Sequence, residues 1–485
     1  MITQTKNFLS DTYGDFKRGT KQFTTKQTLN LIKAIVRHAS YSQTAQLLKL
    51  LEMITPANRK KTIRAIQKDF SQKGPWSKML KKLMSDTNST TLEGFFDNFV
   101  INQCILAEEL RQRFEKKEKF SAPWFMAISP SMRCNLRCVG CYAGKYSKKD
   151  DLPYNHYDRL ICEAKSIGIY FFVILGGEPF FHKDNIKIFT KHKDCFFLVY
   201  TNGTLLNEKK IEQIKHLQNV APAISIEGFE KETTQRRGKN VYKNILKAMD
   251  IMKRKKMLFG FSATFTKKNA SVIASDKFID FMIKKGCTFG WIFQYIPIGE
   301  NPDINLMATP TQREKLRIFS KKVHSTKPIF MADFWNDSPH VGGCMAGGSL
   351  YLHINVKGQV EPCVFTHFST DNIKNKSLIE CLKSPFFKMI RCKGQNIRAP
   401  HRKSDNMLSP CMIIDNPEIL HECITVHKAR ASYQESKQIT SYGKNKAYQF
   451  LKNNYSKSWQ KIADKAWKKE KNNFQYDCGY CRRCK

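Results

Sequence analysis

Short apolar runs alternate with longer stretches of helical periodicity through the middle of the chain. The run YFFVIL at 170–175 is apolar throughout, as expected of a parallel strand that is buried on both faces. The runs that predict strands are 124–129, 170–175, 196–200, 223–226, 258–265 and 288–296. Helices are predicted between them over 154–167, 207–218, 241–256 and 272–285. Strands that alternate with helices predict an α/β fold, in which right-handed crossovers join the parallel strands.

The first 120 residues are predicted to be mostly helical. Apolar residues recur at helical spacing at Ile32, Ile35, Val36, Ala39, Leu47, Leu48, Leu51 and Ile54, and Pro56 ends this stretch. A second helix carries an aromatic and apolar face made of Phe95, Phe96, Phe99, Gln103, Leu106 and Leu110. Such a face can pack in a core, receive a substrate or lie on a membrane surface. We expect core packing, which is the commonest of these outcomes.

The chain has 485 residues, too many for one compact core, so more than one domain is expected. The predicted divisions are an N-terminal helical region at 1–120, an α/β core at 121–300, a linker with a helix at 301–343 and a cysteine-rich region at 344–485. The last region holds nine of the 16 cysteines, which makes it a candidate metal-binding unit.

The cysteine content also bears on the compartment. The first residues lack the apolar core of a secretory signal, and no apolar run is long enough to span a membrane. We therefore expect a cytoplasmic protein. In a reducing compartment, cysteines in this number are better explained as metal ligands than as disulfides.

The formal net charge is +40, and a field of that size attracts polyanions such as nucleic acid, anionic lipid surfaces or acidic peptides. The lysines are spread along the whole chain, however, and the sequence contains no recognisable nucleic-acid module. Most of this charge is therefore expected on solvated faces. A non-catalytic iron–sulfur or zinc protein that binds nucleic acid is kept as a rival interpretation.

Three cysteines stand close together directly after the first predicted strand. Cys134, Cys138 and Cys141 have the spacing C-x3-C-x2-C in the segment SMRCNLRCVGCYAG. Three thiolates can hold three irons of a cubane cluster and leave the fourth iron open, whereas four cysteines close every iron. A structural zinc site needs four protein ligands, so it would require a distant residue. Arg133 and Arg137 flank the cysteines and would offset the charge of a cluster.

Further motifs follow the later strands. Gly176-Gly177-Glu178-Pro179 comes directly after 170–175, and TNG and SIEG follow at the ends of two more strands. All of these lie at the C-terminal ends of strands, where α/β barrels place their chemistry. The cysteine triplet, GGEP and the strand pattern together resemble the radical S-adenosylmethionine (radical SAM) enzymes over residues 124–300.

This resemblance implies a partial (β/α)6 TIM-like barrel with a [4Fe–4S] cluster at Cys134, Cys138 and Cys141. SAM would chelate the fourth iron, and its reductive cleavage would give a 5′-deoxyadenosyl radical. By the same resemblance, the residues expected around SAM are Gly176, Gly177, Glu178, Pro179, Asn202, Ser225, Glu227 and Arg237. GGEP would contact the amino group, Ser225 and Glu227 the ribose or carboxylate, and Arg237 the carboxylate, with Arg236 as an alternative. Helix capping and surface charge are the competing explanations for the polar residues.

The C-terminal cysteines resemble the SPASM domain, an extension of radical SAM enzymes that carries auxiliary [4Fe–4S] clusters. The resemblance rests on CMAGG at Cys344 and on INVKGQVEPC, which ends at Cys363. The further ligands expected are Cys411 and the terminal triplet Cys478, Cys481 and Cys484. Six thiolates fall short of the eight that two closed clusters need, so one auxiliary cluster is expected and a second is left open. A zinc ribbon is the alternative for this region.

The remaining cysteines are expected to have no ligand role. Cys104, Cys162, Cys195 and Cys287 lie in apolar contexts and are predicted to be buried, and Cys381, Cys392 and Cys423 stand alone.

The resemblance implies hydrogen abstraction from a substrate and a flavodoxin-type or ferredoxin-type electron donor. A ribosomally made peptide is the first expectation for the substrate, because peptide-modifying maturases are the commonest relatives with this extension. A small metabolite or a lipid is the second.

Overall fold

The computed structural model describes residues 39–54, 57–143, 151–299, 302–395, 406–432 and 446–474. Predictions made for Ile32, Ile35, Val36, Pro56, Cys478, Cys481 and Cys484 lie outside the described residues.

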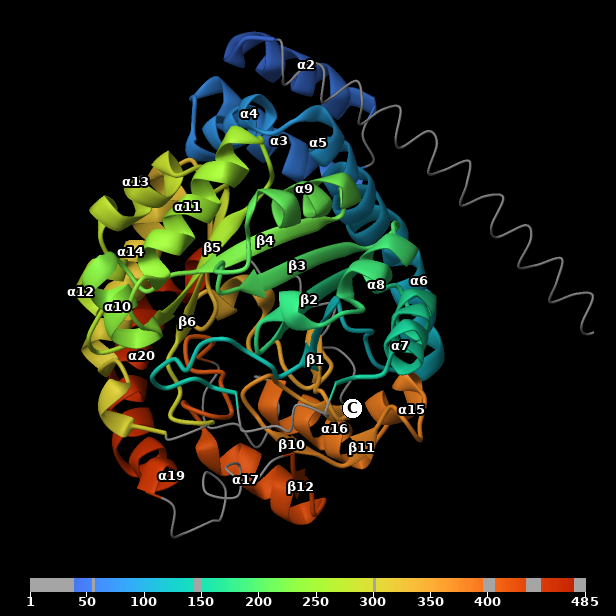
Figure 1. Ribbon diagram of the computed structural model, residues 1–485, viewed down its shortest axis with the longest axis vertical. Coiled ribbons are helices and arrows are strands. Elements are labelled where there is room, and N and C mark those ends of the chain that lie inside the picture. Colours follow the sequence, from blue (N-terminus) through green and yellow to red (C-terminus); the bar gives the residue numbers. More distant parts are fainter. Residues whose placement is uncertain are drawn as a thin grey trace, which may run out of the picture.

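A mostly parallel sheet forms the centre of the protein (Figure 1). Its first six strands are β1 (Phe125–Ser131), β2 (Phe171–Gly176), β3 (Phe196–Thr201), β4 (Val220–Ser225), β5 (Gly260–Phe265) and β6 (Phe289–Gln294). They are parallel neighbours in chain order, with Met126 opposite Phe172 and Ser225 opposite Ser262. The prediction of an α/β fold with parallel strands at these positions is confirmed.

The sheet continues beyond both ends of this six-stranded unit. β7 (Phe330–Asp333) pairs in parallel with β6, so the segment predicted as a linker with a helix contains a strand of the sheet. At the other end, β8 (Tyr351–Ile354) pairs in parallel with β1, and β9 (Gln359–Glu361) pairs antiparallel with β8. The sheet ends at β11 (Asp371–Asn372), while β10 (Phe368–Ser369) and β12 (Arg430–Ala431) form a separate pair. The cysteine-rich region therefore begins as an extension of the core sheet.

Amphipathic helices connect the strands and cover the sheet. In α11 (Val241–Arg254), the apolar residues Ile245, Met249 and Met252 recur at helical spacing and are all fully buried. The other connecting helices are α7 (Tyr154–Ser166), α8 (Asn185–Lys191), α9 (Glu208–Leu217), α10 (Glu230–Arg237), α12 (Ala270–Ile273), α13 (Asp276–Lys284) and α14 (Pro310–Thr326). Polar residues define where they begin: Asn207 and Ser275 cap α9 and α13, and Thr309 forms a capping box with Gln312 on α14.

The N-terminal helices close the end of the sheet that lies opposite the motif loops. They are α2 (Tyr41–Ile54), α3 (Ala57–Ser71), α4 (Pro75–Asp86), α5 (Ser89–Phe95), η1 (Phe96–Leu106) and α6 (Ala107–Glu118). The ring of Phe99 lies 5.2 Å from that of Phe171 and 5.5 Å from that of Phe196, at the starts of β2 and β3. The Gln103 side chain accepts a hydrogen bond from Tyr170 N and donates one to Trp124 O, each at 2.6 Å. The aromatic face is therefore packed in the core, as expected.

The C-terminal part contributes further short helices, some of which lie at the lower end of the view in Figure 1. They are α15 (Leu378–Leu382), α16 (Pro385–Ile390), η5 (Arg391–Gln395), α17 (Pro417–Val426), α19 (Lys446–Phe450), η6 (Leu451–Tyr455) and α20 (Ser456–Glu470). Among the described residues, no helix combines the length and the apolar character needed to cross a membrane.

Candidate functional site

The GGEP turn is hydrogen-bonded to the start of the cysteine loop. Gly177 N donates to Ser131 O at 3.0 Å, and Glu178 N donates to Arg133 O at 2.7 Å. A Cβ atom at Gly177 would lie 2.3 Å from Arg133 O, and Gly176 has a φ of +116°, so this close approach requires glycine at both positions. The end of β2 and the residues before Cys134 therefore form one compact unit.

Glu178 joins this unit to the end of β3. Its side chain is fully buried and accepts hydrogen bonds from Thr201 Oγ1 and Asn202 N, both at 2.7 Å, and from Phe180 N at 3.2 Å. Burial raises the pKa of this carboxyl group, while these hydrogen bonds act in the opposite direction. Glu178 thus holds two strand ends together.

Asn202 continues the connection to the cysteines. Its Nδ2 atom donates to Asn135 Oδ1 at 2.8 Å and lies 3.8 Å from Cys134 Sγ, close enough for an N–H···S hydrogen bond. Asn135 Nδ2 in turn donates to Thr204 Oγ1 at 2.7 Å. The turn after β3 therefore supports one side of the cysteine loop.

Two arginines of α10 support the other side. Glu227 is fully buried, and its Oε1 atom lies 2.7 Å from Arg236 Nη1 and 2.6 Å from Arg237 Nη2. Its second oxygen accepts a hydrogen bond from Thr264 N at 3.1 Å. Burial alone would raise the pKa of Glu227, but the two arginines outweigh it, so the net shift is downward.

The same arginines reach the cysteines. Arg237 Nη1 lies 3.9 Å from Cys138 Sγ, and Arg236 O accepts a hydrogen bond from Val139 N at 2.8 Å. Both guanidinium groups are thus engaged by Glu227, and pairing of Arg237 with the carboxylate of SAM stays a prediction. Two residues expected near SAM remain. Ser225 lies with its Oγ atom 3.1 Å from Ser262 Oγ on the neighbouring strand, and Pro179 is buried, with its carbonyl oxygen accepting a hydrogen bond from Asn185 Nδ2 at 2.7 Å.

The three thiols of the loop suit an iron–sulfur cluster. Cys134 is exposed, and Cys138 and Cys141 are half-buried, so a small molecule can approach them. Burial raises the pKa of Cys134 to about 11 and also raises that of Cys141, so metal binding would have to displace protons from these thiols. The N–H groups of Asn202 and Arg237 next to sulfur atoms would offset the charge of the thiolates.

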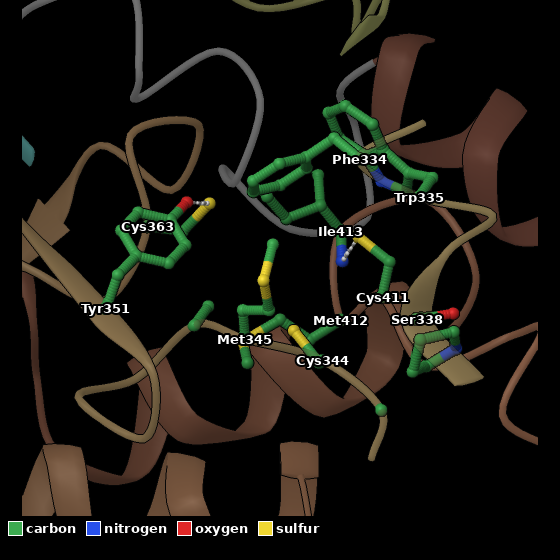
Figure 2. A pocket seen from close by; sticks show the side chains of 13 residues that line it. Phe334, Trp335, Ser338, Cys344, Met345, Tyr351, Cys363, Cys411, Met412 and Ile413 are labelled. Atoms are coloured by element: carbon green, nitrogen blue, oxygen red, sulfur yellow. Dashed lines mark hydrogen bonds between the residues drawn. The ribbon is translucent and has the colours of Figure 1, made fainter. Parts of the chain in front are cut away.

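A second group of thiols lines a pocket in the cysteine-rich region (Figure 2). Cys344, Cys363 and Cys411 come from three separate segments and surround Met345 and Met412. Tyr351 Oη lies 2.7 Å from Cys363 Sγ, which also accepts a hydrogen bond from Phe365 N at 3.5 Å. The sulfur of Cys411 accepts one from Ile413 N at 3.4 Å. The structure thus brings together the three predicted ligands that lie within the described residues.

The other described cysteines differ in burial, and Cys392 is half-buried. Cys195, Cys287, Cys381 and Cys423 are fully buried, as expected of small apolar side chains. Cys104 and Cys162 are exposed, so the prediction that both are buried is wrong. Both lie on the outer faces of helices. Their apolar neighbours in the sequence suggested burial, but the faces that carry the two cysteines are not covered.

A row of aromatic rings connects the two groups of thiols, and the sequence motifs did not indicate it. Tyr142, next to Cys141, packs edge-on against Phe365 with 5.8 Å between ring centroids. Phe365 lies 5.3 Å from Trp335 in the second pocket. The row continues across the sheet through Phe334, Phe293 and Tyr200, all half-buried. The clustering of aromatic residues in FGWIF and ADFW was the only signal in the sequence.

A buried polar network was also missed. Ser129 Oγ on β1 lies 2.7 Å from His353 Nε2 on β8, and His353 Nδ1 lies 2.6 Å from Glu361 Oε2 on β9. Asn355 Nδ2 donates to the other oxygen of Glu361 at 2.8 Å. These side chains join the strand that leads to Cys134 with the strand that leads to Cys363.

Comparison with known proteins identifies two domains in the chain. Residues 128–268 match the model of the radical SAM superfamily, and residues 344–413 match the SPASM model, described as an iron-sulfur cluster-binding domain. The chain therefore contains a radical SAM domain and a SPASM domain, as the motifs predicted.

Individual relatives are distant. An uncharacterized protein of Methanocaldococcus jannaschii is 34% identical over 174 residues, which make up 33% of this chain and 59% of that protein. The AdoMet-dependent heme synthase of Methanosarcina barkeri is 22% identical over 289 residues, or 54% of this chain and 82% of the synthase. Among solved structures, Streptococcus suis SuiB bound to S-adenosylmethionine has a TM-score of 0.52 at 17% identity, covering 70% of this chain and 87% of that chain. This likeness confirms the fold.

Proposed function

We propose, from the radical SAM and SPASM domains that the chain contains, that this protein is an enzyme that uses SAM at a [4Fe–4S] cluster held by Cys134, Cys138 and Cys141. When bound, the cluster and SAM supply a 5′-deoxyadenosyl radical that removes a hydrogen atom from the substrate. The observation that carries the proposal is the pair of hydrogen bonds from Gly177 and Glu178 to the residues before Cys134. They hold the cysteine loop and the GGEP turn in one place, so a ligand bound to one would contact the other.

Each supporting residue has a role in this proposal. The glycines at 176 and 177 leave the backbone open to the amino group of SAM, while Glu178 keeps the turn in position. Asn202 and Arg237 donate N–H groups toward sulfur and offset thiolate charge. The hydroxyl groups of Ser225 and Ser262 are available to the ribose.

We assign the second pocket to an auxiliary [4Fe–4S] cluster. Cys344, Cys363 and Cys411 would supply three ligands, and the terminal triplet at 478, 481 and 484 the fourth. The two cysteines of this triplet that the first auxiliary cluster does not use would be available to a second one. A flavodoxin-type or ferredoxin-type protein would supply electrons, and the cytoplasm stays the predicted location.

A peptide is the substrate that we propose first. The net charge of +40 favours an acidic peptide, and SuiB, which shares the fold, has been crystallised with its precursor peptide SuiA. A flat small molecule is the second candidate, favoured by the half-buried aromatic residues Tyr200, Phe293 and Phe334. The heme synthase among the relatives agrees with this second candidate.

The first test is formation of 5′-deoxyadenosine by the anaerobically reconstituted and reduced protein with SAM. We expect formation that disappears in Cys138→Ala and persists in Cys162→Ala, because Cys162 is an exposed cysteine outside both pockets. Failure of the fully loaded protein to bind SAM would refute the proposal. Stimulation by acidic peptides, or by the iron coproporphyrin after which a related synthase of Methanosarcina barkeri is named, then distinguishes the two substrate classes.

A further inference from the structure

A buried ion pair lies directly behind Cys411. Arg313, near the start of α14, and Asp415 both have fully buried side chains, with 2.5 Å between Arg313 Nη1 and Asp415 Oδ1. The second oxygen of Asp415 lies 3.3 Å from Arg313 Nη2 and accepts a hydrogen bond from Cys411 N at 3.1 Å. The pair is thus connected to the backbone of a proposed cluster ligand.

The surroundings hold the arginine in one orientation. Its guanidinium carbon lies 3.9 Å from the centre of the Trp459 ring on α20, and its Nε atom donates to Asn336 Oδ1 at 3.1 Å. Trp459 Nε1 and Gln460 Nε2, also on α20, donate to Leu408 O and Asp415 O at 3.0 and 3.2 Å. The segment that carries Cys411 is therefore held between α14 and α20.

The charges matter as much as the geometry. Cys411 would bind iron as a thiolate, and the Asp415 carboxylate lies next to it, since its Oδ2 atom accepts the hydrogen bond from Cys411 N. A thiolate beside an uncompensated carboxylate would place two negative charges in a buried site. Arg313 supplies the opposite charge on the far side of the same carboxylate.

We propose that Arg313 and Asp415 are positioning residues for the auxiliary cluster. Asp415 fixes the backbone of Cys411, and Arg313 is the counter-charge that allows carboxylate and thiolate to lie together. Local charge and hydrogen bonding set the reduction potential of iron–sulfur clusters, so the pair controls both assembly and potential. This inference rests on the proposed function, because it requires that the pocket hold an iron–sulfur cluster.

The test uses the full chain with Cys134, Cys138 and Cys141 replaced by alanine, so that iron and electron paramagnetic resonance report the auxiliary site alone. In this background, Arg313→Met is expected to lower bound iron at least twofold and to shift the midpoint potential of the remaining cluster downward. Asp415→Asn removes a negative charge and is expected to shift it upward. The double variant is expected to regain iron relative to Arg313→Met, because no uncompensated carboxylate remains.

Arg317→Met is the matched control. Arg317 on the same helix pairs with Glu470 of α20 at 2.8 Å, so its loss weakens the same helix contact without removing the Arg313–Asp415 pair. Circular dichroism monitors folding. If Arg313→Met does not fold, bound iron and midpoint potential are measured on Arg313→Lys and on the double variant instead. The inference would be overturned if the folded variants bind as much iron as the unsubstituted auxiliary site and have the same midpoint reduction potential. Absence of iron from the unsubstituted auxiliary site would instead refute the proposed function of the pocket.

Discussion

Replacement of Glu227 by glutamine removes the charge that two arginines share. The carboxylate is fully buried, while the side chains of Arg236 and Arg237 are 13% and 10% exposed, so neither arginine is well solvated. Removing one partner of a buried ion pair costs about 3–5 kcal/mol, because the other partner remains buried without compensation. We expect Glu227→Gln to lower the free energy of unfolding by about 4 kcal/mol, a large part of the 5–15 kcal/mol typical of a domain.

Urea unfolding of the metal-free chain, followed by circular dichroism, measures this loss. With a slope of about 3 kcal/mol per molar urea, the midpoint should fall by about 1.3 M. Glu230→Gln is the matched control, because Glu230 is an exposed carboxylate at the start of α10, the helix that carries both arginines, and its loss should change the free energy by less than about 0.5 kcal/mol. Equal midpoints for the two variants would refute the reasoning.

The same variant has a pH signature. The pKa of Glu227 is lowered in the folded state, so its contribution to stability is present above the ordinary carboxyl pKa and is lost as the pH falls through the lowered value. Glu227→Gln should therefore flatten the acid side of the stability profile. An unchanged acid side would show that the ion pairs do not depend on this charge.

Three further predictions concern other parts of the molecule. Gly177→Ala should lower the iron bound at Cys134, Cys138 and Cys141 at least twofold, because its Cβ atom would lie 2.3 Å from Arg133 O; iron analysis checks this, with Gly94→Ala as the control, because its Cβ atom would meet Gln218 O at 1.9 Å at the opposite end of the sheet. Burial lowers the pKa of His367 to about 4 in the folded chain. As the pH falls below about 6.5, this histidine takes up a proton in the unfolded chain but not yet in the folded one, so the free energy of unfolding should fall by about 1.4 kcal/mol for each pH unit down to about pH 4. His367→Asn should remove this slope in pH-dependent unfolding, and the same replacement at the exposed His216 should not. Asparagine is chosen because it tolerates the φ of +54° at position 367. Phe99→Ala should lower the free energy of unfolding by about 3 kcal/mol without changing liposome co-sedimentation, because its ring packs against Phe171 and Phe196; a change in co-sedimentation alone would favour a membrane role.

The sequence predicted those parts of the site that depend on local patterns. Strand ends, glycine turns and the spacing of Cys134, Cys138 and Cys141 are all encoded within a few residues, and the cysteine loop and GGEP turn do lie together. The family resemblance suggested a role near SAM for Arg237, but only the structure shows Glu227 between the two arginines.

Long-range contacts could not be predicted in this way. Ser129 and His353 are 224 residues apart, and Arg313 and Asp415 are 102 residues apart, so no periodicity or spacing relates them. The exposure of Cys104 and Cys162 was mispredicted for a related reason. Apolar neighbours show that a helix packs somewhere, but which of its faces is covered depends on elements distant in the chain.

The pairing of β8 with β1 has a consequence for how this protein can be divided. β1 is buried along its whole length, and β8 satisfies the row of backbone groups along its outer side. A chain ending at residue 343 would keep the radical SAM domain of 128–268 but turn β1 into an open, apolar edge strand. Exposed edges of that kind pair with other chains. Removal of the auxiliary region should therefore yield aggregates rather than a smaller enzyme. The backbone hydrogen bonds between β1 and β8 thus make the two proposed cofactor sites parts of one folding unit.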